Sequence, residues 1–252
     1  MAYDLGLVDK CRETGDSYLR FYSWKPYAIS LGYNQSRSSH NFALDYNRLK
    51  TDCIDVVERP TGGRAVFHSE ELTYSVVMKT DKPIHDTYRD ISVAIVNGLK
   101  TIEDSTGRIN ELSFTKDTPD LFNLIKTGMY NLCFNSQVKN EINFRGRKLV
   151  GSAQRKLGDI ILQHGSLLLG SRHRGIVDYI ICPDEEKQKM ALEIGEKTVC
   201  LNDIAGRNMS YAETADAVLK GFVSTYGIKF SSINRLAELI SQRKLDHESI
   251  MN

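Results

Sequence analysis

Two glycine-rich segments hold the side chains of this 252-residue chain that could carry out chemistry. The first is Arg59-Pro-Thr-Gly-Gly-Arg-Ala-Val-Phe-His68, and the second runs from Gly146-Arg-Lys148 through Gly151-Ser-Ala153 to Gln163-His164-Gly165. Glycine lets backbone N–H groups approach a ligand closely and tolerates positive φ. Because each segment also supplies a cation and a histidine, we predict that the two hold one anionic or carbonyl-bearing ligand between them.

The residues of the first segment allow two interpretations. Gly62 and Gly63 could form only a tight turn between two strands, which is the commoner role of an isolated Gly-Gly pair. Arg59 and Arg64 bracket that pair, however, and a planar guanidinium suits a carboxylate or a phosphate. His68 could bind either a neighbouring loop or the ligand.

The second segment centres on Lys148. This lysine could lie on a solvated strand edge, where lysines are common. The small residues Gly151-Ser152-Ala153 follow it closely, however, and small residues in a strand suit close approach of a ligand. Lys148 would then be a fixed cation in a pocket, acting on a carbonyl or an acyl phosphate. His164 and Gly165 complete the ligand-binding candidates.

The five cysteines are irregularly spaced and form no Cys-x-x-Cys pair, so reduced thiols and a cytoplasmic location are expected. Most free cysteines are small buried hydrophobic residues. Cys133 differs in position, because it lies in a loop that leads into the Lys148 segment, where cations could lower the pKa of a thiol. We interpret the other four as packing residues. The histidines form no i, i+4 pair and have no cysteine partner, so no metal site is predicted.

The composition is ordinary for a soluble globular protein, with 41% hydrophobic and 26% charged residues. A net charge of +1 argues against a nucleic-acid partner. No apolar run approaches the roughly 20 residues that span a bilayer, and no signal peptide is recognisable, so no membrane partner is expected. Basic residues do cluster locally on the predicted hairpin that carries the second segment; they are Arg145, Arg147, Arg155 and Lys156.

Hydrophobic periodicity predicts an α+β fold (mixed α/β), in which helices pack a mixed β-sheet core. The predicted strands are 17–24, 28–33, 54–57 and 72–78, and a strand–turn–strand–turn–strand unit over 138–169. The predicted helices are 2–12, 41–50, one with a capping box at Thr87–Asp90, 184–194, one from the Ser210 capping box to Gly227, and 233–244. Residues 104–131 are predicted to be a long loop. We expect a single domain over 1–252, with a mainly helical part from about residue 184.

At these motifs the chain resembles the biotin/lipoate protein ligase catalytic family, from residue 2 to about residue 227. The first segment is similar to that family's Arg-x-[Ser/Thr]-Gly-Gly-x-x-Val-x-His loop, and the second to its lysine motif. Within the family, Gly-Gly-Arg, a Glu71-Leu-Thr-Tyr-Ser75 segment and a Cys133-Phe134 pair look closest to LipM-type octanoyltransferases. The resemblance implies a biotin/lipoate ligase-like catalytic domain.

The resemblance also implies an activity. An octanoyl group would pass from octanoyl-acyl carrier protein to a thioester on Cys133, and then to a lysine of a lipoyl domain, in lipoate biosynthesis. The acceptor would be the glycine cleavage H protein or a 2-oxoacid dehydrogenase E2. Lys148 would be catalytic beside Cys133. The substrate-binding residues would be Arg59, Gly62, Gly63, Arg64, His68, Gly151, Ser152, Ala153, His164 and Gly165. No cofactor is expected.

Two alternatives stay open at this point. The first is an ATP-dependent lipoate–protein ligase, which would require ATP and Mg²⁺, with Lys148 holding an acyl-adenylate and Cys133 a bystander. The second is a non-catalytic protein that binds lipoyl domains and keeps only the pocket.

Overall fold

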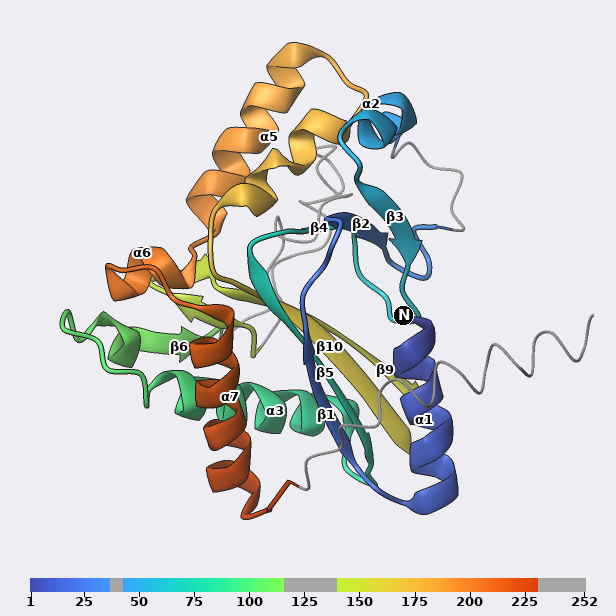
Figure 1. Cartoon of the computed structure of the whole chain (residues 1–252), viewed down its shortest axis with the longest axis vertical. Coiled ribbons are helices and arrows are strands. Elements are labelled where there is room, and N and C mark those ends of the chain that lie inside the picture. The colour runs from blue at the N-terminus through green and yellow to red at the C-terminus, as the bar shows by residue number, and fades with distance from the viewer. Residues whose placement is uncertain (37–42, 116–139, 231–252) are drawn as a thin grey trace, which may run out of the picture.

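The computed structural model describes residues 1–36, 43–115 and 140–230, and it has the expected α+β fold (Figure 1). The helices are α1 (Ala2–Thr14), α2 (Tyr46–Thr51), α3 (Ile84–Leu99), α5 (Asp184–Lys197), α6 (Leu201–Ala205) and α7 (Tyr211–Tyr226). Two 3₁₀ helices are η1 (Arg108–Glu111) and η4 (Arg172–Tyr179). The strands are β1 (Tyr18–Tyr22), β2 (Ala28–Leu31), β3 (Asp55–Glu58), β4 (Val66–His68), β5 (Glu71–Lys79), β6 (Leu112–Phe114), β7 (Ile142–Phe144), β8 (Arg147–Lys148), β9 (Val150–Leu157) and β10 (Ile160–Leu168).

A four-stranded antiparallel sheet in the order β1-β5-β10-β9 forms the centre of the molecule. Its register places Gly165 of β10 between Tyr74 of β5 and Ser152 of β9. Successive side chains on a strand point to opposite faces. His164 therefore points to the face opposite that of Tyr74, Gln163 and Ser152.

Two three-stranded sheets complete the β structure of the described residues. In the order β3-β2-β4, strand β2 pairs with β3 in parallel and with β4 in antiparallel fashion. The segment between β3 and β4, residues 59–65, is the glycine-rich segment predicted from the sequence, and we call it the glycine loop. The third sheet has the order β6-β7-β8 and places Lys148 opposite Asn143.

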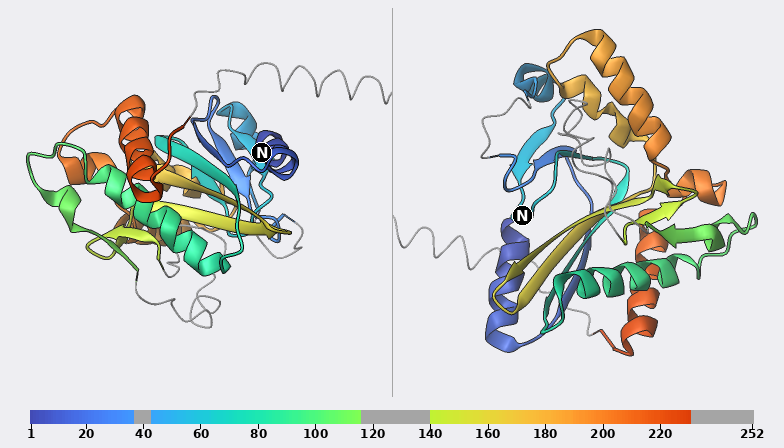
Figure 2. Two further views of the ribbon diagram at one scale, coloured as in Figure 1. Left: turned by 90° about the horizontal axis from the view of Figure 1, so that it is seen from below. Right: turned by 180° about the vertical axis from the view of Figure 1, so that it is seen from behind.

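Helices cover both faces of the central sheet (Figures 1 and 2). On one face, Leu7, Val8 and Cys11 of α1 pack against Val77 and Leu162. On the other face, α3 and α7 pack over the larger apolar core. None of the helices within the described ranges is long and apolar enough to cross a membrane.

Helices α3 and α7 cross at unusually close range because each contributes a glycine at the contact. A Cβ added at Gly221 would lie 2.1 Å from the carbonyl oxygen of Ala94, and one added at Gly98 would lie 2.3 Å from that of Ala217. Both distances fall far inside van der Waals contact, so only glycine permits this approach of the two backbones.

Several element boundaries differ from the sequence-based expectation. Helix α3 begins at Ile84 after the N-cap residue Pro83, so Thr87 lies inside the helix and donates its hydroxyl to the Pro83 carbonyl at 3.3 Å. The predicted loop over 104–131 contains η1 and β6 in its described part. Cys53 is exposed in a turn with φ of 54°, so its interpretation as a packing residue was wrong.

The predicted N-terminal cap of α7 at Ser210 is confirmed. The hydroxyl of Ser210 accepts a hydrogen bond from the backbone N–H of Glu213 at 3.1 Å, as the capping box predicted. The Glu213 carboxylate pairs with Arg207 instead of returning to the cap. The helix predicted over 233–244 lies outside the described residues.

We expect Gly221→Ala to destabilise the protein by about 1–3 kcal/mol, because the added methyl group must push two packed helix backbones apart. Urea unfolding followed by circular dichroism measures the change. Lys220→Ala, at the neighbouring exposed position of α7, is the matched control and should stay within about 0.5 kcal/mol of wild type. Equal stability of Gly221→Ala and wild type would show that the two helices can separate without cost.

Candidate functional site

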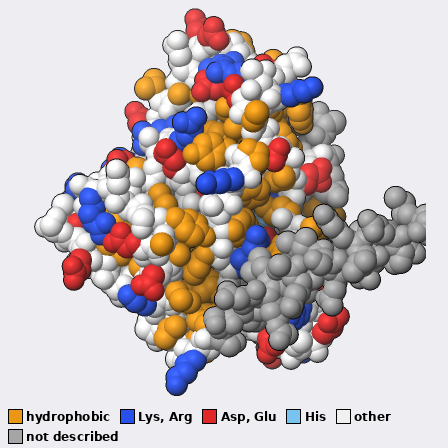
Figure 3. All heavy atoms as spheres, in the orientation of Figure 1, with side chains coloured by type: hydrophobic (Ala, Val, Ile, Leu, Met, Phe, Trp, Pro, Cys, Tyr) orange, Lys and Arg blue, Asp and Glu red, His pale blue; other side chains and the backbone are white. Residues whose placement is uncertain are grey.

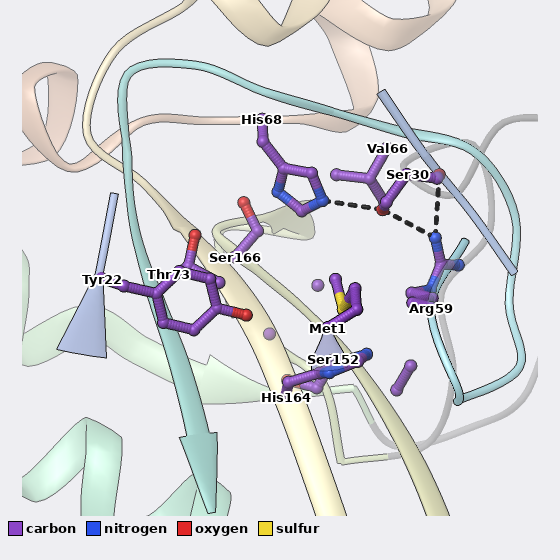
Figure 4. A pocket seen from close by; sticks show the side chains of 13 residues that line it. Met1, Tyr22, Ser30, Arg59, Val66, His68, Thr73, Ser152, His164 and Ser166 are labelled. Carbon is purple, nitrogen blue, oxygen red and sulfur yellow. Dashed lines mark hydrogen bonds between the residues drawn. The ribbon is translucent and has the colours of Figure 1, made fainter. Parts of the chain in front are cut away.

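A cavity lies where the central sheet, the β3-β2-β4 sheet and the start of α1 meet (Figure 4). Its volume is about 30 Å³, room for about two water molecules or one carbonyl group. The side chains and backbone that line it are those of Met1, Tyr22, Ser30, Arg59, Val66, His68, Thr73, Gly151, Ser152, Ala153, His164, Gly165 and Ser166.

The fold brings the two predicted motifs together at this cavity. Seven of the candidate residues are among its lining: Arg59, His68, Gly151, Ser152, Ala153, His164 and Gly165. Gly62, Gly63, Arg64 and Lys148 lie outside the lining. Cys133, the predicted nucleophile, lies outside the described residues. Segments that are distant in the sequence therefore share one site, because residues of β4, β9 and β10 line the same cavity.

Arg59 binds the glycine loop itself. Its side chain is buried, and its guanidinium donates hydrogen bonds to the carbonyl oxygens of Gly62 at 3.2 Å and Arg64 at 2.5 Å. Another nitrogen donates to the carbonyl and the hydroxyl oxygens of Ser30, both at 2.9 Å. The sequence suggested a guanidinium held for a ligand anion, but these described contacts use it to shape the loop.

Two glycines of the motifs have different structural roles. Gly63 has φ of 93°, and a Cβ there would lie 2.8 Å from the guanidinium of Arg59, so glycine is required. A Cβ at Gly165 would lie 2.6 Å from the ring of Tyr74 and 2.7 Å from the hydroxyl of Ser152. Gly165 therefore leaves room for the ring of Tyr74 on the face of the sheet that the two residues share, opposite the face of His164.

Gly62 and Pro60 of the glycine loop differ from Gly63 in their contacts. A Cβ at Gly62 would meet no heavy atom of the described residues within 4 Å, so packing within the described residues does not require glycine here. Arg155 of β9 contacts the glycine loop by donating a hydrogen bond to the carbonyl oxygen of Pro60 at 2.8 Å. Its guanidinium also lies 4.5 Å from the ring centre of Tyr33.

Two residues of the basic cluster predicted on the hairpin form hydrogen bonds to other parts of this chain. Arg155 is committed to the glycine loop, and Arg145 donates to both carboxylate oxygens of Glu111, at 2.7 and 2.9 Å. Arg147 and Lys156 are the remaining basic residues of this cluster.

His68 lies in a buried chain of hydrogen bonds. Its Nε2 lies 2.7 Å from the hydroxyl of Ser30, and its Nδ1 lies 2.7 Å from the carboxylate of Glu71. The indole of Trp24 stacks on the imidazole with ring centres 4.4 Å apart and an interplanar angle of 16°. Both nitrogens and one face of the ring are therefore held in place.

Glu71 is a buried carboxylate that three side chains satisfy. Besides His68, Thr73 donates its hydroxyl at 2.5 Å and Ser166 donates to the second carboxylate oxygen. Burial alone would raise the pKa of Glu71, but attraction to His68 and these hydrogen bonds outweigh it and hold the pKa below its usual value. Glu71 is therefore ionised at neutral pH.

His164 is the second histidine of the cavity. Its Nε2 lies 2.5 Å from the hydroxyl of Thr61 in the glycine loop, and its Nδ1 lies 3.9 Å from a carboxylate oxygen of Asp4 in α1. Burial lowers the pKa of His164 below its usual value although Asp4 opposes that shift, so its imidazole is neutral near pH 7.

Asp4 ties helix α1 to the central sheet. One carboxylate oxygen accepts hydrogen bonds from Arg20 and from Ser75, both at 2.9 Å. Burial alone would raise the pKa of Asp4, but His164, Arg20 and Ser75 favour the ionised form and lower the pKa to about 2.

Lys148 is paired with a carboxylate that the sequence analysis did not single out. Its Nζ donates to Glu141 at 2.7 Å, and both side chains are buried, with 1% and 2% of their surface exposed. Lys148 was expected to point into the pocket. The structure instead places it in this ion pair, beyond the lining of the cavity, because β8 pairs with β7 rather than with the central sheet.

Sequence reasoning missed the polar residues that contact the histidines, namely Asp4, Ser30 and Thr61, and it missed Glu141, which pairs with Lys148. It used Glu71 only as part of a motif. A signal for two of them was present. Ser30 interrupts the apolar strand Ala28–Leu31, and Glu71 opens a strand that is buried over most of its length. Buried polar residues of this kind are hydrogen-bonded and often functional. No three His, Cys, Asp or Glu side chains within the described ranges converge as a metal site.

The chain is similar in sequence to lipoyl protein ligases and octanoyltransferases. Residues 1–223 match the family model described as the lipoyl protein ligase A/B catalytic domain. Octanoyltransferase LipM of Staphylococcus aureus is 32% identical over 240 residues, which span 92% of this chain and 84% of that protein. Octanoyltransferase LipM of Bacillus subtilis is 29% identical over 235 residues, which span 90% and 80%.

Solved structures share the fold. A bipartite lipoate protein ligase of Thermoplasma acidophilum superimposes with a TM-score of 0.71 at 24% identity, covering 97% of this chain and 86% of that one. Lipoate-protein ligase A bound with ATP superimposes with a TM-score of 0.70 at 22% identity, covering 97% and 87%. These similarities establish the fold.

We expect Asp4 to contribute stability that depends on pH. Its pKa of about 2 in the folded protein lies below the roughly 3.9 of an unfolded chain, so this contribution is present above pH 4 and is lost as the pH falls towards 2. The difference corresponds to about 2.6 kcal/mol. Urea unfolding midpoints measured from pH 6 to pH 2 should therefore fall less steeply for Asp4→Asn than for wild type.

Asp9→Asn provides the control for this pH series. Asp9 lies on the same helix but is exposed and pairs with Arg12 on the surface. Its substitution should leave the wild-type slope unchanged. Parallel curves for Asp4→Asn and wild type would contradict the assignment to Asp4.

Proposed function

Because the chain belongs to the lipoyl protein ligase A/B catalytic domain family, we propose that it transfers an octanoyl group through a thioester on Cys133 to a lysine of a lipoyl domain. The curated relatives are octanoyltransferases, so the chain is an enzyme of the acyltransferase class. The donor in this proposal is octanoyl-acyl carrier protein. The acceptor is the glycine cleavage H protein or a 2-oxoacid dehydrogenase E2.

The observation that carries this proposal is the meeting of the two motifs at one cavity, in a chain that is similar to octanoyltransferases over 92% of its length. The cavity has room for a carbonyl group, and the glycine loop contributes Arg59 to its lining. Backbone N–H groups aimed at a developing oxyanion are a common source of catalysis in acyl transfer.

The proposed reaction has two steps. The Cys133 thiolate attacks the thioester of the donor, which forms an acyl-enzyme and releases the carrier thiol. The amine of the acceptor lysine then attacks this second thioester and forms an amide. Exchange of thioesters is nearly isoenergetic and conversion of a thioester to an amide is favourable, so the reaction requires neither ATP nor a metal.

The partners are proposed on chemical grounds. Acyl carrier proteins are acidic, so a local basic surface would speed their encounter with this nearly neutral chain. On the face drawn in Figure 3, basic and acidic side chains are interspersed, with no large area of one sign. Arg147 on β8 and Lys156 on β9 are the candidates for docking the carrier.

We expect Cys133→Ser to lose the covalent intermediate. Wild-type protein incubated with octanoyl-acyl carrier protein should gain the mass of one octanoyl group on Cys133, measured by intact-protein and peptide mass spectrometry. The serine variant should not, because its hydroxyl does not ionise near neutral pH. A wild-type transfer rate in the serine variant would refute the mechanism, and modification that requires free lipoate and ATP would identify the ligase alternative.

The Lys148–Glu141 pair allows stability and catalysis to be separated. Lys148→Met should destabilise the protein by about 3–5 kcal/mol, because it leaves the Glu141 charge buried without this partner. The double variant Lys148→Met/Glu141→Gln should recover most of that stability, measured by urea unfolding.

Transfer activity should remain lost in the stable double variant if the Lys148 ammonium acts on the acyl group. Glu141→Gln alone is the matched control, since it removes the carboxylate charge but keeps the lysine. Full activity in the double variant would show that Lys148 serves the fold only.

A further inference from the structure

From the geometry at the cavity we infer that Ser30, His68 and Glu71 form a proton relay, which takes the proton released when the acceptor amine attacks the acyl group. The inference rests on the proposed function. The three side chains come from β2, β4 and β5, and their hydrogen bonds measure 2.7 Å from Ser30 to His68 and 2.7 Å from His68 to Glu71. Ser30 and His68 both line the cavity (Figure 4).

The hydrogen-bonding capacities determine the direction of the relay. Glu71 is ionised and only accepts, so Nδ1 of His68 carries a proton. In the neutral imidazole Nε2 is then an acceptor, and the hydroxyl of Ser30 donates to it. A hydroxyl oxygen has two lone pairs, and Arg59 occupies one of them at 2.9 Å. Within the described residues, the second lone pair remains for a donor in the cavity.

The relay is held rigidly, as proton transfer requires. Trp24 stacks on His68, and its indole nitrogen donates to Thr73 at 2.9 Å. Thr73 and Ser166 in turn hold the carboxylate of Glu71. A histidine whose far nitrogen is fixed by a carboxylate keeps one tautomer and can stabilise the imidazolium that forms during catalysis.

In the proposed step, the amine nitrogen forms a bond to the acyl carbon and the carbon–sulfur bond breaks. The amine proton passes to the oxygen of Ser30 while the hydroxyl proton of Ser30 passes to Nε2 of His68. The resulting imidazolium lies against the Glu71 carboxylate. The Cys133 thiolate that leaves then takes this proton from His68, which gives the Cys133 thiol and the neutral imidazole.

Titratable and charged groups from several elements lie around His68 at the cavity. The titratable and charged groups around it in the described residues are Glu71 on β5, Arg59 on the glycine loop, Tyr22 on β1, His164 on β10, His173 on η4, Asp4 on α1 and the amino group of Met1. Burial lowers the pKa of His173 to about 4 and that of His164 below its usual value, so both stay neutral above pH 7. Burial raises the pKa of Tyr22, so this phenol also stays neutral.

The experiment follows the second step alone. The octanoyl-enzyme is formed with octanoyl-acyl carrier protein and mixed with the lipoyl domain of a 2-oxoacid dehydrogenase E2. Its decay is measured by quenched-flow mass spectrometry from pH 6 to pH 10. Ser30→Ala should slow the decay about 100-fold at pH 7, a size typical of general base catalysis. The difference should narrow to less than about tenfold at pH 10, where hydroxide can accept the proton.

Ser92→Ala is the matched control, because Ser92 is equally buried but lies on α3. It should retain the wild-type profile. A merely structural role of Ser30 would slow the reaction by the same factor at every pH, and that result would overturn the relay, as would an unchanged rate. Failure of the wild type to form the octanoyl-enzyme would overturn both this inference and the proposed function.

A second variant tests the relay without relying on Ser30. His68→Ala removes the imidazole beneath Trp24, and added imidazole should restore the decay of its octanoyl-enzyme at least tenfold, in proportion to the neutral imidazole present. No restoration in a protein with a native circular dichroism spectrum would count against the relay. An octanoyl ester on Ser30 in the Cys133→Ser variant would show that Ser30 is a nucleophile instead.

Discussion

A buried carboxylate costs several kcal/mol unless hydrogen-bond donors replace its water, and the site is arranged around that constraint at Glu71. His68, Thr73 and Ser166 supply these donors from β4, β5 and β10. Satisfying one carboxylate therefore fixes how the two sheets meet and which nitrogen of His68 faces Ser30. Trp24 then covers one face of the imidazole.

The same physical logic recurs at two neighbouring places. Asp4 joins α1 to the central sheet through Arg20 and Ser75, and Arg59 holds the glycine loop through carbonyl oxygens of the loop itself. Charges that resemble ligand-binding groups in the sequence are thus used to shape the backbone. What they leave at the meeting point of the two sheets is the small cavity that His68, Ser152 and His164 help to line.

Lys148 illustrates why a residue type cannot be assigned a role before its partners are known. The sequence shows a lysine followed by apolar and small residues, a pattern consistent with a cation in a pocket. Its carboxylate partner Glu141 lies seven residues earlier, across the β7–β8 turn. Pairing across a turn depends on strand register, which hydrophobic periodicity does not specify.

The sequence by itself determined the α+β class, most of the strands and helices, and the two motifs that meet at the cavity. Those features depend on local periodicity, turn residues and motif spacing, which act over a few residues. It could not show that Glu71 and Ser30 hold His68 from opposite sides, or that Arg59 turns inward to its own loop. These contacts join β2, β4, β5 and β10, and only the tertiary structure decides them, because burial makes each polar group depend on partners that are distant in the chain.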